Sequence, residues 1–291
     1  MNTYAWLVRR EFWENRAIWM IPAAVGALMI LAALFGRVHQ MSLPLEFPGL
    51  AVGELFLISI GATFFSVMSI YATWYLLDCL YADRKDRSIL FWKSLPTSDA
   101  ATVLSKLATA LIVIPLVYFA AADLTSLLLA FVVSIRASSS FGGALWHAGL
   151  WLQLQVLWLY LIVASAIWYL PVAGYLLVIS AWARRAVMMW SILLPIAAML
   201  AERWFLGTHA IATQLGERLF GLPGVAFHAN AGDGAWMTTA VGDATVRMPA
   251  GIWKFLDVGG FLTSPQTWIG AGLGVALLAW AIRLRERRAE I

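Results

Sequence analysis

Long apolar runs separated by short charged stretches define the pattern of this chain. Four stretches of 20 or more residues contain no charged side chain: 17–36, 55–77, 137–183 and 258–282. As a helix, each is long enough to cross a hydrocarbon core of about 30 Å. The pattern therefore predicts an all-α membrane protein that crosses the bilayer several times, with residues 1–291 forming a single transmembrane domain.

The stretch 137–183 admits two interpretations. It holds either one span preceded by an interfacial helix, or two spans joined by a tight turn. With one span, the chain has six in all, the third interrupted by Asp123, the fourth bent near Pro171 and the fifth carrying Pro195. These six spans lie at about 17–36, 55–80, 107–133, 157–182, 186–204 and 266–282.

The distribution of basic residues decides between the two interpretations, because cytoplasmic segments of membrane proteins are enriched in Lys and Arg. With one span in 137–183, the short segments hold 14 Lys and Arg on the cytoplasmic side and 2 outside, Arg37 and Arg136. With two spans, the same residues divide 8 to 8. We therefore expect six transmembrane helices with both termini cytoplasmic, and residues 138–147 as an outer turn and interfacial entry.

The residues before the first span mix aromatic and charged side chains. In a helix, Trp6 and Trp13 share one face, with Arg9 and Arg16 placed to reach lipid headgroups. We expect Thr3–Ile18 to form an N-terminal interfacial helix on the cytoplasmic leaflet. The alternative is a helix that simply extends the first span.

A long outer segment, 202–265, separates the fifth and sixth spans. Its glycines, prolines and scattered charges predict a small, loop-rich lid rather than a separately folding domain. Some helix is expected in it, around Ala210–Phe220.

The composition excludes a soluble fold for the bulk of the chain. Apolar residues make up 62% and charged residues 12%, against about 25% charged in an ordinary soluble domain. The 16 Trp and 8 Tyr suit the two membrane–water interfaces. Although the pI is about 9.4, the basic residues cluster at the ends of apolar segments, which indicates topology and not nucleic-acid binding. The first apolar run is full length and is expected to remain as an anchor.

Sequence motifs for catalysis are lacking. The chain has no GxxxxGK[ST] phosphate loop, no HExxH and no GxSxG. Its single cysteine, Cys79, excludes an intrachain disulfide and a cysteine-based metal site, and is expected to be a packing residue. The four histidines fall in predicted outer segments without ligand spacing: His39, His147, His209 and His228. We therefore expect no enzyme, and no cofactor or metal in this chain.

Two features lie inside the predicted spans: a set of glycines and one carboxylate. Gly270, Gly272 and Gly274 lie in the last span, where small residues let helices approach closely. Asp123 is the ionisable residue well inside a span, and a carboxylate at mid-bilayer costs about 2.5–3.5 kcal/mol on insertion scales. Asp123 is either a pathway or gating residue for transport, or a structural residue. In the second case it is a buried hydrogen-bond partner of Ser or Thr hydroxyls, a neutral acid, or an anchor nearer the membrane interface, and all of these interpretations stay open.

The cytoplasmic segment between the second and third spans carries an apolar cluster in a charged setting. Residues 89–92, Ile-Leu-Phe-Trp, follow the charged run 83–87 and precede Ser-Leu-Pro at 94–96. Asp86 is a good helix start and Pro96 a firm stop. Exposed apolar residues ringed by charge mark an interaction site. The alternative is a short helix lying flat under the bundle, with Trp92 in the headgroups.

The string from Leu77 to Lys106, LDCLYADRKDRSILFWKSLPTSDAATVLSK, resembles the first cytoplasmic loop of bacterial ABC-2-type transporter permeases. Those proteins carry a similar charged run, then Ser-Ile/Val-x-Phe, then Ser-Leu-Pro before the third span. Six spans, an N-terminal interfacial helix and a long outer segment before the last span extend the resemblance along the chain.

The resemblance implies the membrane subunit of an ATP-driven exporter in a bacterial inner membrane. In that family, the loop holds a coupling helix that docks on a separate ATPase subunit, which would bind ATP and Mg. Here the coupling helix would comprise Asp86, Arg87, Ser88, Ile89, Leu90, Phe91, Trp92, Lys93, Ser94 and Leu95. The expected partners are the ATPase, a second permease chain (identical or related) and membrane lipid.

The substrate is not identified, although an amphipathic or antimicrobial compound suits an apolar, Trp-rich bundle. A rival from another class is an ion-coupled secondary transporter. Such carriers often place paired charges at the midplane, and Asp123 is a single charge.

Overall fold

A computed structural model describes residues 3–36, 49–85, 98–136, 145–227, 236–241, 244–249 and 256–288. The helices before the outer segment are α1 (Thr3–Glu14), α2 (Ala17–Phe35), α3 (Gly49–Lys85), α5 (Asp99–Ala108), the π-helix η2 (Thr109–Val113), α6 (Ile114–Arg136), α8 (Ala148–Trp168), α9 (Leu170–Trp182) and α10 (Val187–Leu206). The remaining elements are α11 (Ala210–Phe220), α12 (Leu222–Ala226), β1 (Trp236–Val241), β2 (Ala244–Pro249), α14 (Val258–Thr263) and α15 (Pro265–Arg288).

Six helical stretches in the described part of the chain are long and apolar enough to cross a membrane. They are Ala17–Phe35, Phe56–Lys85, Asp99–Arg136, Ala148–Trp168, Val187–Leu206 and Pro265–Arg287. The expectation of a multi-pass helical membrane protein is thereby confirmed. In the fourth stretch the helix starts at Ala148, ahead of the expected 157, because residues 148–156 are also free of charge and continue the helix.

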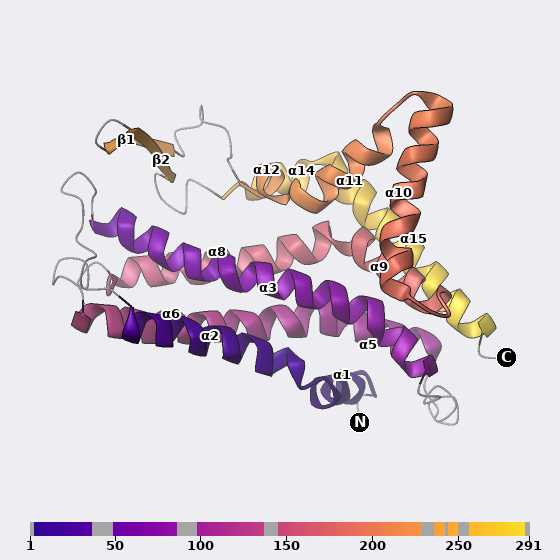
Figure 1. The fold of residues 1–291 in the computed structure, drawn as a ribbon, viewed down its shortest axis with the longest axis horizontal. Helices are drawn as coiled ribbons and strands as arrows, with labels where there is room; N and C mark the ends of the chain where they lie inside the picture. Colours follow the sequence, from indigo (N-terminus) through magenta and orange to yellow (C-terminus); the bar gives the residue numbers. More distant parts are fainter. Residues whose placement is uncertain are drawn as a thin grey trace.

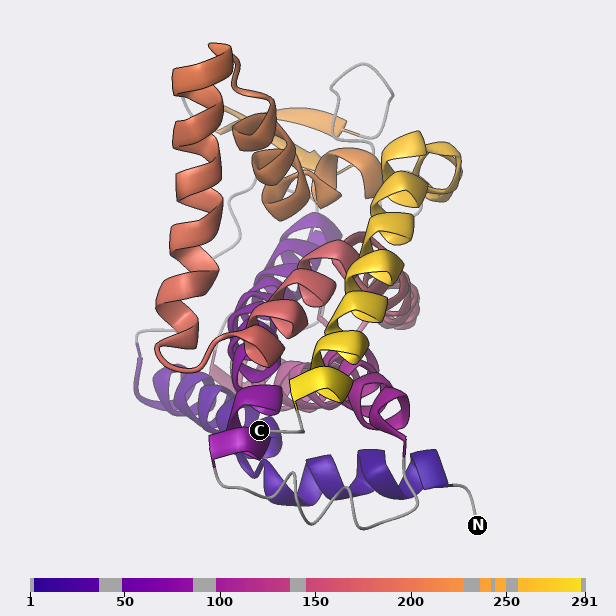
Figure 2. The same ribbon diagram turned by 90° about the vertical axis from the view of Figure 1, so that its right-hand side faces the viewer.

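The long helices α2, α3, α6 and α8 lie side by side and form the body of the bundle (Figure 1). The short helix α1 runs across one end of the bundle, and α15 packs along α9 (Figure 2). In contrast, α10 stands to one side of the bundle (Figure 2), and only 6% of its most apolar 18-residue stretch is buried.

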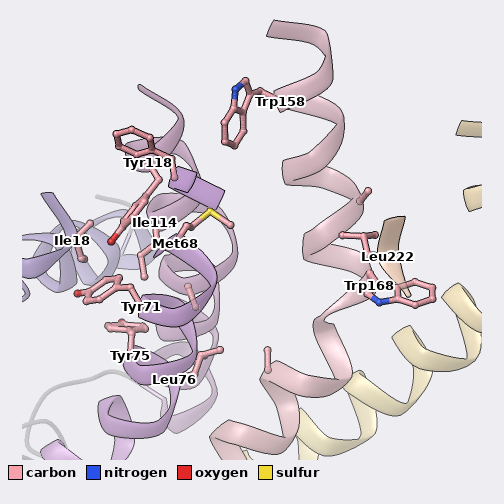
Figure 3. Close-up of a cluster of buried hydrophobic side chains, with 14 of the residues drawn as sticks. Ile18, Met68, Tyr71, Tyr75, Leu76, Ile114, Tyr118, Trp158, Trp168 and Leu222 are labelled. Carbon is pink, nitrogen blue, oxygen red and sulfur yellow. The ribbon is translucent and has the colours of Figure 1, made fainter. Parts of the chain in front are cut away.

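Aromatic side chains fill much of the core. Figure 3 shows Tyr71 and Tyr75 of α3 facing Tyr118 of α6, and Tyr71 and Tyr118 stack with ring centroids 6.2 Å apart. Trp158 and Trp168 lie on α8, and Trp168 is almost completely enclosed. The core therefore joins helices that are far apart in sequence.

Two prolines coincide with irregular points in the helices. Pro115 has no N–H to donate to Leu111, and the preceding residue, Ile114, donates to the carbonyl of Thr109 five residues back, which makes the π-helix η2. Pro171 lies just after Tyr169, the single residue that separates α8 from α9. The helix bends at this point without reversing (Figure 1).

The bend is covered by α11. The Arg218 guanidinium lies over the Trp168 ring, 4.4 Å from its centroid, and donates to the carbonyls of Trp168 and Gln266. The Trp168 indole N–H donates in return to the Arg218 carbonyl over 3.0 Å. Arg218 thus joins α11, the bend and the start of α15, and a side chain at Gly270 would collide with it.

In the segment between α10 and α15, α12 and α14 pack on the middle of α8 rather than beyond its end (Figure 1). The Tyr160 hydroxyl donates to the carbonyls of Ala226, 3.0 Å away, and Asp257, 3.2 Å away. The Tyr160 ring also meets Phe227 and Phe261 edge to face. Within the segment, the expected helix around Ala210–Phe220 is observed as α11.

An antiparallel hairpin, β1–β2, pairs Trp236 with Pro249 and Val241 with Ala244. The sequence analysis does not predict it. A signal is present nonetheless, because Thr-Thr-Ala-Val and Ala-Thr-Val flank Gly242-Asp243, a pair typical of two-residue hairpin connections. The short hairpin departs from the all-α expectation only locally.

Candidate functional site

The ten residues of the expected coupling helix, Asp86–Leu95, lie outside the described residues. The helices on either side are described. The segment leaves α3 after Lys85 and returns at Ser98, whose hydroxyl caps α5 by accepting from the Ala101 N–H over 3.1 Å. The candidate functional site is therefore the set of residues that holds the end of α3 and the start of α5 in place.

A buried ammonium group lies between two carboxylates close to these ends. Lys106 Nζ of α5 is 3.0 Å from Glu11 Oε1 of α1 and 3.3 Å from Asp83 Oδ1 of α3. The exposed fraction of the side chain is 4% for Lys106, 3% for Glu11 and 9% for Asp83. The Tyr75 hydroxyl also donates a hydrogen bond to Glu11, to Oε2 over 2.7 Å.

The last helix joins the same group of charges. Arg285 of α15 places Nη1 3.1 Å from Asp83 Oδ2 and Nε 2.9 Å from Asp99 Oδ1. Asp83 is therefore shared by Lys106 and Arg285. We refer to Glu11, Asp83, Asp99, Lys106 and Arg285 as the ion network.

The ion network connects four helices, α1, α3, α5 and α15, where α3 ends and α5 begins. Buried charges cost free energy unless they are paired, and removing one member of a buried pair typically costs about 3–5 kcal/mol. These helix ends are therefore fixed to one another, and a displacement of one strains the others.

A second set of bonds fixes α3 to the end of α9. The Arg84 guanidinium donates to the carbonyls of Ser180 and Ala183, the latter over 2.9 Å. The buried Ser180 hydroxyl oxygen accepts from the backbone N–H groups of Leu80 and Tyr81, at 3.2 and 3.1 Å. The end of α3 is therefore held from both sides, by the ion network and by α9.

Asp123 is hydrogen-bonded to a residue outside the ion network. Its Oδ1 accepts from Gln155 Nε2 of α8 over 2.7 Å, and its side chain is half-buried. The partner is an amide rather than the expected Ser or Thr hydroxyl. The hydrogen bond from Gln155 therefore joins α8 to α6 through Asp123.

The ion network is not predicted by the sequence analysis. In the sequence, Lys106 and Arg285 each lie near the end of an apolar run, so they enter only the count of basic residues that sets the topology. Glu11 is one charged residue of the mixed N-terminal stretch Thr3–Ile18. The available signal was that Asp83, Asp99 and Lys106 all flank the 86–97 segment. The pairing with Glu11 and Arg285 requires the fold.

Metal ligation has no support within the described ranges. Among those residues, no group of three or more His, Cys, Asp or Glu side chains is placed to hold a metal ion. The thiol of Cys79 is buried in the core.

Comparison of the chain with models of protein families, with curated proteins and with solved structures found no match. The resemblance to ABC-2-type permeases therefore has no support from these comparisons and remains an expectation from residues 77–106 and the arrangement of spans.

Proposed function

We propose that this chain is the permease subunit of an ABC exporter of a bacterial inner membrane, driven by a separate ATPase subunit. One observation carries the proposal: both helix ends that flank the 86–97 segment are fixed by the ion network to α1 and α15. A segment that transmits force from a partner needs such a rigid attachment to the membrane helices.

The attachment is direct on both sides. Asp83 lies two residues before the end of α3, and Asp99 is the first residue of α5. If an ATPase pushes or turns the 86–97 segment, both carboxylates move with it. Lys106 and Arg285 then carry the displacement to α1 and α15.

The chemistry of hydrolysis belongs to the partner in this proposal. The chain has no phosphate loop, so ATP and Mg would be held by the ATPase. A second permease chain, identical or related, would complete the transporter. The cargo would be an amphipathic compound.

An ion-coupled secondary transporter is the second candidate. The observation that favours it is the buried pair of carboxylates, Glu11 and Asp83, around one ammonium group, since such groups also occur in ion and proton pathways. Transport that continues without ATP and follows an ion gradient would identify this class. Transport that needs the ATPase would identify the exporter.

The test of the exporter uses the apolar residues of the expected coupling helix. Trp92→Ala and Phe91→Ala should weaken binding of the partner ABC ATPase by about thirtyfold, equivalent to about 2 kcal/mol, because aromatic anchors dominate small interfaces. Hydrolysis should also become uncoupled from transport. The measurement is a quantitative pull-down of the purified ATPase by the full-length chain, with ATP hydrolysis and transport followed in vesicles.

Trp13→Ala is the matched control, because Trp13 lies on α1 and is 68% exposed. It should leave ATPase binding unchanged. The melting temperature of the isolated permease should change little in all three variants. A Trp92→Ala permease that is unstable but still binds the ATPase would show instead that these rings pack under the bundle.

A further inference from the structure

A cavity of about 360 Å³ opens beside the ion network, between the α1–α2 junction and α3. Glu14, Asn15 and Ala17 line it from the junction. Tyr71, Trp74 and Asp78 line it from α3. Glu11, Asp83 and Lys106 also border the cavity, so it adjoins the charges described above.

The charges at this cavity disfavour an anion. Lys106 already donates to Glu11 and Asp83, and Arg10 is paired with Glu14 over 2.6 Å. Each cation at the described wall of the cavity is therefore already paired with a carboxylate, which leaves none for an anion. Asp78, in contrast, makes no ion pair or hydrogen bond with another described residue. Its carboxylate is available to a cation.

The aromatic wall favours the same class of ligand. Trp74 is 54% exposed beside Asp78, and Tyr71 is buried further in. The face of an indole or phenol ring attracts an ammonium group, and Trp does so most strongly. A carboxylate together with aromatic faces is the combination that recognises organic ammonium groups.

The position of the cavity indicates an amphiphile. Ala17 is the first residue of the apolar helix α2, so the cavity lies at the level where that helix begins. On α3, Ile70 and Trp74 are 73% and 54% exposed, which gives an alkyl chain an apolar surface next to the opening. A ligand with an ammonium head and an apolar chain fits both parts.

We propose that this cavity binds the ammonium group of an amphiphile, with Asp78 as its counter-ion and Trp74 and Tyr71 as its aromatic wall. The ammonium group comes either from a membrane lipid such as phosphatidylethanolamine or from a non-lipid compound. The site itself does not depend on the exporter proposal. Only the assignment of a non-lipid amphiphile as cargo rests on it.

The test uses the full-length chain in nanodiscs of digalactosyldiacylglycerol, a lipid whose neutral head group carries no ammonium, with empty nanodiscs to subtract partitioning. Equilibrium dialysis should show saturable binding of octylammonium and none of octyl phosphate. Asp78→Asn should weaken octylammonium binding by about tenfold or more, because the counter-ion is lost. Trp74→Ala should weaken it by about threefold to tenfold.

Glu286→Gln and Trp280→Ala are the matched controls. Glu286 is an exposed carboxylate on α15, and Trp280 is 54% exposed, as Trp74 is. Both variants should bind octylammonium like the unmodified chain. Absence of saturable binding, equal binding of octyl phosphate, or binding that Asp78→Asn leaves unchanged would overturn the site.

Nanodiscs that contain phosphatidylethanolamine distinguish the two sources. If this lipid competes with octylammonium at the site, the occupant is the lipid. If octylammonium still binds, the occupant is a non-lipid amphiphile. ATPase binding is not part of these measurements, so a negative result would leave the exporter proposal standing.

Discussion

Lys106 is the residue on which the α1 side of the ion network depends, because one ammonium group serves both Glu11 and Asp83. Lys106→Met keeps most of the side-chain volume but leaves two buried carboxylates without it. We expect the free energy of unfolding in mixed micelles to fall by about 3–5 kcal/mol. The same measurement on Arg16→Met is the control, because Arg16 is exposed and its loss should change stability by about 0.5 kcal/mol or less.

The double variant Glu11→Gln with Lys106→Met separates pairing from packing. Because the two side chains are in contact, their effects should not add, and the double variant should lose less than the sum of the single losses. Strictly additive losses would contradict a paired Glu11 and Lys106.

Asp123 can be tested without disturbing its geometry. In Asp123→Asn, the side-chain oxygen still accepts from Gln155, so the melting temperature should change little. If Asp123 belongs to the translocation path, transport by the assembled complex should fall by about tenfold or more, since the charge is lost. Gln155→Leu removes the donor but keeps the carboxylate, and should retain transport. Normal transport by Asp123→Asn would make Asp123 a structural partner only.

At the scale of elements, the glycines of α15 are not equivalent. A side chain at Gly274 would come within 2.7 Å of Leu170 Cγ, whereas nothing lies within 4 Å of the corresponding position at Gly272. Gly274→Ala should therefore force α15 away from α9 and cost about 1–3 kcal/mol of unfolding free energy. Gly272→Ala should be neutral or slightly stabilising. Equal effects of the two variants would show that α15 does not pack on α9 in this register.

The elements divide into those that local sequence determines and those that it does not. The first span, expected at 17–36, is observed as Ala17–Phe35 because charged residues bound the apolar run on both sides. The hairpin and the π-helix are weaker signals, carried by a Gly-Asp pair and a single proline. Helix type and approximate position follow from local patterns, whereas the exact ends depend on neighbouring helices.

The candidate site shows where sequence reasoning stops. A charge near the end of a span reads equally well as a topology signal, a headgroup contact or a buried pair. Glu11 and Arg285 are 274 positions apart in the sequence, and only packing brings Glu11 to Lys106 and Arg285 to Asp83. The Asp123–Gln155 bond is of the same kind, since Gln155 is one polar residue among many at span positions.

For the whole molecule, the decisive prediction concerns orientation in the membrane. In a Cys79→Ala background, Arg184→Cys should react with a membrane-impermeant thiol reagent only from the cytoplasmic side, because 14 of the short-segment Lys and Arg residues lie there by the charge count. Asp233→Cys should react only from outside. Arg184 is exposed, so access will not limit its labelling. Labelling of residue 233 from the cytoplasmic side would contradict six spans with both termini inside.

Synthesis order gives the ion network a further consequence. Glu11 leaves the ribosome before any of the six long apolar helices has been made, and Arg285 leaves it only after five of them have. Until α15 arrives, Asp83 and Asp99 lack their guanidinium partner, and the incomplete bundle carries carboxylates that water or the insertion machinery must shield. The last of the six long helices therefore also completes the packing of the second and third, and a chain truncated before Arg285 would leave Asp83 and Asp99 without that partner.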